Sequence, residues 1–513
     1  MKNKLIWLLG LSVVLTACDI NNELDAIEAD VVVEVKATAG SADFSKFVAV
    51  GASFTAGYSD GALFKATQEN SFPSILAKKF AMTNGGAFTQ PLMNDNIGGL
   101  LLGGNLIAAP RLFFNGAGPA VLPATPTTET SSVLSGGFNN MGVPGAKSFH
   151  IVANGYGNLA GVPLGQANPY FARMASSATT SVLADVMAQS PTFFTLSEIG
   201  GNDVLGYATS GGSGKDQKGN LDATTYGSND ITDPNVFASV FSTMVNTLTS
   251  GGAKGAVATL PNITSLSHFT TVPYNPVPLD AATAGAVNGG YALYNSGIIN
   301  AFAALVGLNV MTQAQADAEV AKRTINFVAG QNAVVIIDED LTDLEALNPN
   351  FAGLKQYRQA TASDLLVLPS SSFIGTTVGG NPLLINGVSV PLEDKWVLTP
   401  EEQLNIKTAT DAYNVTIKAV AASKGLAIVD FEAILVQAST TGTTFDGYTM
   451  TTNLVTGGLI SLDGVHLTSR GYAFMANKFL EAIDATYGSN YGKATNGLAK
   501  AGSYPTNFSA TLR

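Results

Sequence analysis

The chain has 513 residues, of which 46% are hydrophobic and 12% charged, so it contains enough apolar residues to bury a sizeable core. Its 38 acidic residues outnumber its 26 basic ones and give a net charge of -12; no Lys/Arg-rich run is present, which argues against nucleic-acid binding. The single cysteine excludes an internal disulfide and any cysteine-based metal cluster.

The N-terminal segment has the pattern of an export signal. Two lysines precede an apolar run, residues 5–15, that is too short to span a bilayer. The run ends in Leu-Thr-Ala-Cys, which resembles the lipobox of bacterial lipoproteins, and this resemblance makes Cys18 the lipidated N-terminus. We therefore expect residues 1–17 to be a lipoprotein signal peptide and residues 18–45 to be an acidic tether behind a lipid anchor.

This anchor implies a place in the bacterial cell envelope. The several acyl chains of such lipoproteins meet the two-signal requirement for stable attachment to a membrane. The outer membrane is the expected location, and the sequence leaves the choice of leaflet open.

Five short apolar runs further along the chain predict strands. Each contains apolar residues in succession rather than in strict alternation, which is typical of a parallel sheet covered on both faces. The runs are residues 47–50, 192–199, 255–260, 333–338 and 426–431.

Helices are predicted between these runs. Thr399 has the pattern of an N-cap, because Pro400 follows it and Glu402 completes a capping box, and Gly425 ends the helix. A second amphipathic helix begins near Thr468. Strands alternating with helices indicate an open α/β fold, in which ligands bind beyond the carboxyl ends of the strands.

Long loops rich in Gly, Pro and Thr interrupt this pattern. We expect them to be insertions in one domain, residues 46–487, that is followed by a C-terminal tail, residues 488–513. The insertions lie around residues 92–132, 209–234 and 310–398. The second is rich in Asp and Asn but lacks the spacing of an EF-hand, which favours a solvated loop over a Ca²⁺ site.

A serine directly after the first predicted strand raises the question of nucleophilic catalysis. Ser53 would need a base to take its proton. Of the three histidines, only His466 has an acidic residue within three positions: Asp463, which can bind the imidazole Nδ1–H and leave Nε2 facing outward. His150 and His268 are expected to be structural.

Acyl transfer also needs hydrogen-bond donors for the oxyanion that forms. Asn202 follows the second predicted strand, so its side chain can reach the same sheet edge as Ser53. Gly142 and Gly145 lie in Asn-Asn-Met-Gly-Val-Pro-Gly, where a backbone N–H could approach a substrate closely. The two glycines could instead serve only a tight turn around Pro144.

Four fragments in this order resemble the four blocks of the SGNH (GDSL-like) hydrolase superfamily. They are residues 51–54, 140–145, 200–203 and 463–466. The resemblance implies that Ser53 is the nucleophile, His466 the general base and Asp463 its orienting partner. It implies an oxyanion hole formed by the backbone N–H groups of Ser53 and Gly145 and by the side chain of Asn202. The implied fold is α/β: a three-layer α/β/α sandwich with a mainly parallel, flavodoxin-like sheet.

Two residues depart from the family's pattern. Its usual Asp before the serine is Ala52 here, and its usual Leu after the serine is Phe54. We therefore expect the serine loop to be supported differently, whereas the triad is complete. Ser53 could also simply cap the first helix, and Asp203 is interpreted as an ordinary helix N-terminal residue.

The main hypothesis is a serine esterase or lipase that cleaves carboxylic esters through an acyl-enzyme, with no metal and no organic cofactor. Its partner would be an ester-bearing small molecule, a lipid or an acylated glycan, and the apolar segment 97–114 is a candidate lid or acyl groove. The chain is expected to be a monomer. The alternative is a non-catalytic surface lipoprotein that binds a glycan, a lipid or a protein on the same scaffold.

Overall fold

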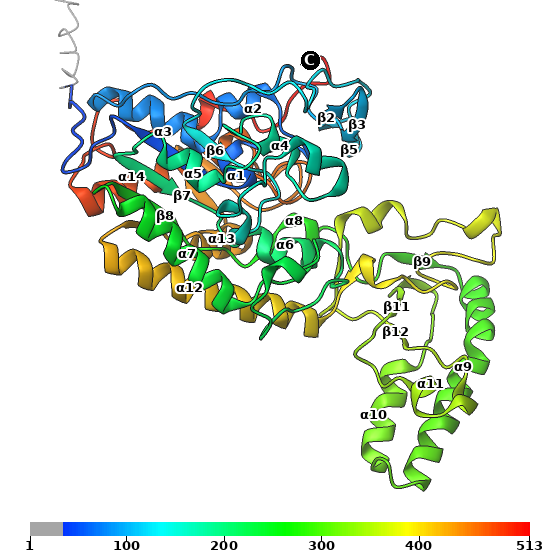
Figure 1. Ribbon diagram of the computed structural model, residues 1–513. Coiled ribbons are helices and arrows are strands. Elements are labelled where there is room, and N and C mark those ends of the chain that lie inside the picture. Colours follow the sequence, from blue (N-terminus) through cyan, green and yellow to red (C-terminus); the bar gives the residue numbers. More distant parts are fainter. Residues whose placement is uncertain (1–33) are drawn as a thin grey trace, which may run out of the picture.

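A five-stranded sheet lies at the centre of the main domain (Figure 1). The computed structural model describes residues 34–513; the signal peptide, Cys18 and the first part of the expected tether lie outside these residues. Across residues 34–513 no helix is both long enough and apolar enough to cross a membrane. The strands of the sheet are β1 (Phe47–Gly51), β6 (Asn140–Gly142), β7 (Phe193–Leu196), β8 (Lys254–Ala258) and β15 (Ala427–Val429).

All neighbouring strands of this sheet are parallel, in the order β15-β8-β7-β1-β6. Ala49 of β1 pairs with Thr195 of β7 on one side and with Asn140 of β6 on the other. β1 and β7 are buried along their whole length, which explains why their sequences are continuous apolar runs. The mixed α/β class with a parallel sheet is confirmed, and the carboxyl ends of all five strands meet at one edge.

Helices connect these strands, and three small antiparallel hairpins complete the domain. The helices are α1 (Ser53–Ala56), α2 (Lys65–Glu69), α3 (Phe72–Phe80), α4 (Pro169–Ala172), α5 (Val182–Met187), α6 (Asn202–Thr209), α7 (Pro234–Thr249), α8 (Ser267–Thr270), α12 (Pro400–Lys424), α13 (Phe431–Thr440) and α14 (Ser469–Tyr487). The hairpins are β2 (Leu100–Leu102) with β3 (Asn105–Ala108), β4 (Leu112–Phe114) with β5 (Pro119–Val121), and β16 (Thr443–Phe445) with β17 (Tyr448–Met450).

The long helices begin and end where their capping residues predict. Thr399 and Glu402 form a capping box at the start of α12, and Gly425 ends this helix in the left-handed conformation. Thr468 caps α14 by accepting the backbone N–H of Gly471. Both helix predictions are confirmed.

Stacked aromatic side chains lie between the helices of two packed pairs, α3 with α14 and α7 with α12. α3 packs on α14, where the rings of Phe72 and Phe479 stack with centroids 5.0 Å apart. α7 packs on α12, where Tyr413 stacks on Phe237 at 4.3 Å. Such pairs contribute about 0.5–1.5 kcal/mol beyond the burial of their area.

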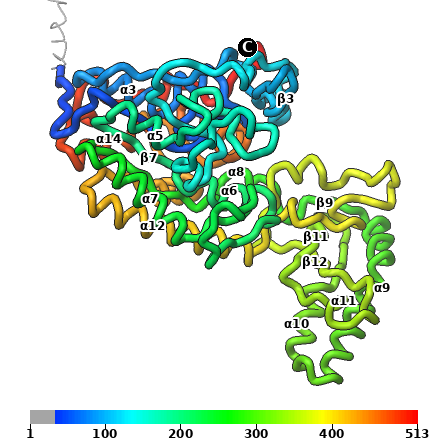
Figure 2. Tube along the Cα trace, in the orientation of Figure 1, coloured from blue at the N-terminus to red at the C-terminus, as the bar shows by residue number. Residues whose placement is uncertain are grey.

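A second lobe lies beside the sheet domain, between α8 and α12 in the chain (Figures 1 and 2). It has hydrophobic clusters of its own, one around Val335 and Leu392 and one around Phe302 and Leu344. Its elements are β9 (Val277–Leu279), α9 (Ala281–Gly307), α10 (Gln313–Arg323), β10 (Gly330–Asn332), β11 (Val335–Ile337), α11 (Leu344–Leu347), β12 (Tyr357–Gln359), β13 (Leu365–Leu366) and β14 (Val397–Leu398). The lobe therefore includes β9 and α9, which precede the insertion expected at residues 310–398.

One predicted strand, residues 333–338, pairs with a different strand from the one expected. Residues 333–338 were predicted to belong to the parallel sheet, but β11 pairs antiparallel with β12 inside the lobe. The lobe buries Val334, Val335 and Ile336 completely, so this run is as apolar as a strand of the central sheet. Hydrophobicity alone cannot distinguish two separately buried sheets.

Both ends of the described chain pack on the sheet domain. Phe44, in the segment expected to be a tether, is 2% exposed and stacks on Phe80 with ring centroids 3.8 Å apart. In the expected C-terminal tail, the carbonyl oxygens of Ser509 and Leu512 accept hydrogen bonds from the buried guanidinium of Arg111 at 2.7 and 3.0 Å.

Substitution of Phe44 tests whether the segment before β1 contributes to stability. Phe44→Ala would leave a cavity beside Phe80, and removal of a buried Phe typically lowers the free energy of unfolding by about 3–5 kcal/mol. The matched change is Val35→Ala, whose side chain is 41% exposed and should cost little. Urea denaturation measures both; equal stability of the two variants would show that Phe44 belongs to a loose tether.

Candidate active site

Asp463 and His466 form a hydrogen-bonded pair on the turn that precedes α14. The ring Nδ1 of His466 lies 2.8 Å from Asp463 Oδ2, and both side chains are 13% exposed. The other carboxylate oxygen, Oδ1, accepts the backbone N–H groups of Val465 and His466 at 2.9 and 2.8 Å. The bond at Nδ1 fixes the ring and leaves Nε2 as the nitrogen free to exchange a proton with a substrate group.

The environment of Asp463 keeps its carboxyl ionised. Burial by itself would raise the pKa of Asp463, but the charge and hydrogen bond of His466 and the two backbone N–H groups outweigh it and hold this pKa well below its usual range. An ionised Asp463 can stabilise the imidazolium that forms when His466 accepts a proton.

The helix that carries Ser53 lies against this turn. Gly61, just after α1, donates its N–H to Asp463 Oδ2 at 2.7 Å. The rings of Tyr58 and Phe54 lie 4.6 and 5.7 Å from the His466 ring, centroid to centroid. Ser53 is the first residue of α1 and is 7% exposed. The chain thus brings together two segments that are separated by some four hundred residues.

No hydrogen bond joins Ser53 Oγ to His466 or to any other side chain of residues 34–513. Catalytic hydrogen bonds are often long without substrate and shorten in the reacting complex. The structure therefore places Ser53 on the helix that packs against the His466–Asp463 pair, and of the two expected side-chain bonds it contains the one between His466 and Asp463.

The two glycines of the fragment 140–145 have different surroundings: Gly142 is closely packed, and Gly145 has open space around it. A Cβ at Gly142 would overlap the backbone nitrogen of Ala56, so this glycine permits β6 to approach α1. Gly145 has φ 79° and would meet nothing within 4 Å, so its backbone is accessible from outside. Of the two glycines, Gly145 is therefore the one whose backbone N–H could reach a substrate, as the family resemblance implies.

Asn202 begins α6 beside Ser53. Both residues line the same cavity. One N–H of the Asn202 amide donates to the carbonyl oxygen of Ala146 at 2.9 Å, which holds the side chain next to Gly145. The adjacent Asp203 is completely buried and accepts both the N–H and the hydroxyl of Ser148, so its role is structural, as predicted.

Glu198 is a residue of this site that the sequence analysis missed. It lies just after β7 with φ 46°, and its Oε1 accepts the N–H groups of Ala52 and Thr55 at 2.6 and 2.8 Å. A Cβ on Gly51 would come within 2.9 Å of the same oxygen. Glu198 therefore supplies the carboxylate that supports the serine loop, where Ala52 offers none. An acidic residue directly after a buried strand was the available signal.

Asp60 is a second buried acid that holds the two halves of the site together. Its carboxylate accepts the N–H of Leu462 at 3.0 Å, and its own N–H donates to Ser461 Oγ at 3.0 Å. Burial raises the pKa of Asp60 to about 7. The loop after α1 is thus tied to the two residues that directly precede Asp463.

The other two histidines are packed side chains. His150 stacks on Tyr156 with centroids 4.3 Å apart, and burial followed by the nearby charge of Lys147 lowers its pKa to about 4. His268 donates its backbone N–H to the carbonyl oxygen of Gly464 at 2.9 Å and so supports the turn that carries His466.

A large apolar cavity opens beside Ser53. It encloses ≈ 1000 Å³ of empty space, its open mouth included. Ser53, Glu198 and Asn202 line it together with side chains of α6, α13, α14 and the segment after β8. The apolar lining residues include Leu260, Leu266, Phe431, Ile434, Phe474 and Met475. Residues 97–114, the segment expected to form a lid or acyl groove, are not part of this lining.

Comparison with known proteins adds no relative. No protein-family model matches the chain, and neither a curated protein nor a solved structure shows a significant match.

Two substitutions of Glu198 distinguish the effect of its titration on stability from the effect of its hydrogen bonds. Burial raises the pKa of Glu198 to about 7, so the folded chain holds a proton that the unfolded chain releases near the ordinary glutamate pKa of 4.5. Between these two pH values the free energy of unfolding of the wild-type chain should fall as the pH rises. Glu198→Gln keeps an acceptor for Ala52 and Thr55 but does not titrate, so its free energy of unfolding should fall less over the same pH range. Urea denaturation at about pH 5 and about pH 8 measures it.

Glu198→Ala is the matched variant. It leaves two backbone N–H groups without an acceptor, at about 1–3 kcal/mol each, and should destabilise the chain at both pH values. Equal stability profiles for the wild type and both variants would contradict a supporting role for Glu198.

Proposed function

We propose that the protein is a serine ester hydrolase of the SGNH type, with the three-layer α/β/α arrangement that this superfamily implies. The observation that carries the proposal is the His466–Asp463 pair, which is hydrogen-bonded at 2.8 Å and packed against the helix of Ser53. The packing of α3 with α14 and of α7 with α12 around a parallel sheet supports the fold assignment.

In the proposed reaction His466 Nε2 takes the proton of Ser53 Oγ as this oxygen attacks the ester carbonyl. The carbonyl oxygen becomes an oxyanion that the backbone N–H groups of Ser53 and Gly145 and the Asn202 amide stabilise. The imidazolium, stabilised by Asp463, then protonates the departing alcohol. A water deprotonated by His466 releases the acid from the acyl-enzyme and regenerates the serine.

The cavity favours an ester with a long acyl chain among the possible substrates. Apart from Ser53, Ser197, Glu198, Asn202 and Thr259, its lining is apolar, and burial of each CH₂ group contributes about 0.8 kcal/mol. An alkyl chain fits this environment, whereas a glycan would leave its hydroxyl groups without partners there. A lipid-like carboxylic ester is therefore the proposed substrate class.

The proposed location is the bacterial cell envelope. The lipobox-like sequence that ends in Cys18 supports a lipid anchor, which would hold the domain near a membrane and thus near lipid substrates.

A non-catalytic binding protein on the same scaffold is the second candidate. It is favoured by the absence of a hydrogen bond between Ser53 and His466 among the described residues. In that case the apolar cavity would bind a lipid without cleaving it.

Hydrolysis of p-nitrophenyl esters distinguishes the two candidates. The purified chain should release p-nitrophenol, and Ser53→Ala or His466→Ala should lower kcat/KM at least about 10³-fold. Asn202→Ala should cost about 10²–10³-fold in kcat, because it removes one oxyanion donor. Ser177→Ala, on an exposed loop, is the matched control and should retain full activity. An active Ser53→Ala variant would refute the mechanism.

Acyl-chain preference tests the role of the cavity. Ile434→Trp on α13 would fill part of the cavity and should lower activity on the dodecanoyl ester while sparing the acetyl ester. Val436→Trp, two residues along the same helix but 51% exposed and outside the lining, should leave the preference unchanged. The ratio of kcat/KM for the two esters is the measurement, and an equal ratio in wild type and Ile434→Trp would place the acyl chain elsewhere.

A further inference from the structure

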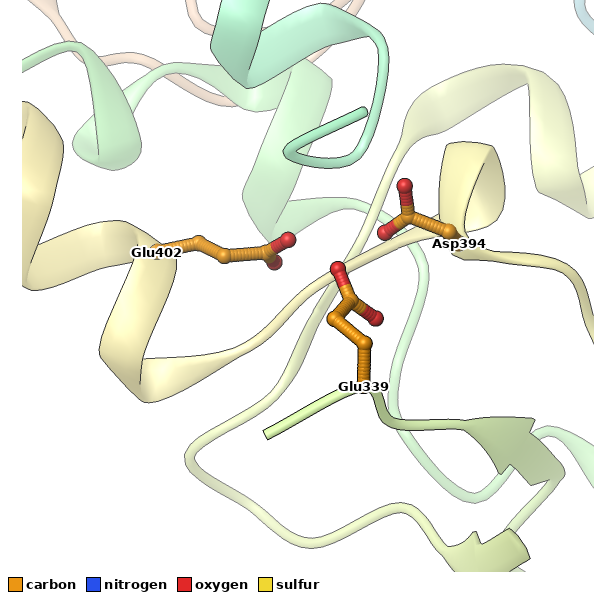
Figure 3. A group of neighbouring side chains, drawn as sticks. All are labelled: Glu339, Asp394 and Glu402. Carbon is orange, nitrogen blue, oxygen red and sulfur yellow. The ribbon is translucent and has the colours of Figure 1, made fainter. Parts of the chain in front are cut away.

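Three carboxylates converge where the second lobe joins the sheet domain (Figure 3). Glu339 follows β11 of the lobe, Asp394 lies on the turn before β14, and Glu402 is in the first turn of α12. One oxygen from each of the three lies within 4.8 Å of the others. Figure 3 shows the three side chains pointing toward one another from these separate elements.

Glu402 carries a buried oxygen that has no protein partner. The residue is 4% exposed, and its Oε2 accepts the N–H of Thr399 at 2.7 Å. Its Oε1 is buried and has no hydrogen-bond partner among the described residues. A Cβ on Gly212 would overlap this Oε1, so a glycine leaves the space that the oxygen occupies. Such an oxygen is costly to bury unless something binds it.

In the part of the chain that the structure describes, no positive side chain forms an ion pair with this cluster. Among the ion pairs of residues 34–513, none includes Glu339, Asp394 or Glu402; Lys395 pairs instead with the exposed Glu393. Three carboxylates this close together repel one another when all are ionised, and Glu402 is also buried. The three acids therefore either share protons or bind a cation.

We infer that this cluster is a binding site for a divalent cation of the calcium class. Carboxylate oxygens are ligands for hard cations, and Ca²⁺ binds them at about 2.3–2.6 Å, so that two ligands on opposite sides lie roughly 4.8 Å apart. The partly exposed Glu339 and Asp394 leave room for water ligands, which Ca²⁺ takes in its flexible shell. Carboxylates from a loop, a turn and a helix suit the flexible coordination of Ca²⁺ better than the strict octahedron of Mg²⁺.

Such a cation would fasten the lobe to the sheet domain. Glu339 belongs to the lobe and Glu402 to the helix that packs on the sheet, so one ion would bridge the two parts. Because binding to the folded chain alone stabilises it, calcium should raise the Tm. This inference does not depend on ester hydrolysis.

Calorimetric titration of the chelator-treated full-length chain with CaCl₂ tests the inference. One Ca²⁺ per chain is expected, with a dissociation constant on the order of 10⁻⁴ M, and with a rise in Tm at saturation. Glu402→Gln keeps the helix cap, because Gln serves a capping box as Glu does, but it should weaken Ca²⁺ binding at least about tenfold. Asp394→Asn should do the same.

Glu393→Gln is the matched control, because it removes one negative charge next to Asp394 from outside the cluster, and it should bind Ca²⁺ as the wild type does. Absence of binding heat and of a Tm shift at about 10 mM CaCl₂ would overturn the inference and leave shared protons as the explanation. Unchanged affinity in Glu402→Gln, or tighter binding of Mg²⁺ than of Ca²⁺, would overturn it as well.

Discussion

The carboxylate of Asp463 is the interaction on which the site depends. One of its oxygens accepts hydrogen bonds from the His466 ring and from Gly61 N–H, and the other accepts two backbone N–H groups of its own turn. It therefore orients the imidazole and holds the loop after Ser53 at the same time. Without this carboxylate, the His466 ring would lose its orientation and the two segments would lose the group that both of them bind.

The parallel sheet and the helix caps could be predicted because their signals are local. Continuous apolar runs and the capping box at Thr399 depend on residues that are close in sequence. Ser53, Asn202 and the Asp463–His466 pair could be proposed as site residues because each lies next to a strand end or a helix start. Their convergence follows from the parallel sheet, which brings the carboxyl ends of its strands to one edge.

Features that arise only from tertiary packing could not be predicted. The run at residues 333–338 has the composition of a central strand, and only its pairing with β12 shows that it belongs to another lobe. Glu198 supports Ala52 and Thr55 across 143 or more positions of sequence, and Glu339 meets Asp394 and Glu402 only through the fold. Likewise, the apolar cavity is lined by α13 and α14 rather than by the apolar segment 97–114, whose composition alone suggested an acyl groove.

Covalent labelling with a fluorophosphonate tests most directly whether Ser53 and His466 act as one catalytic unit. Trypsin cleavage after Lys46 and Lys65 gives the peptide 47–65, which contains Ser53. The account predicts an adduct whose fragment ions place it on Ser53 in the wild-type chain and not in His466→Ala, because the serine reacts only when a base takes its proton. A folded wild-type chain that remains unlabelled, or a His466→Ala chain labelled equally fast, would contradict it.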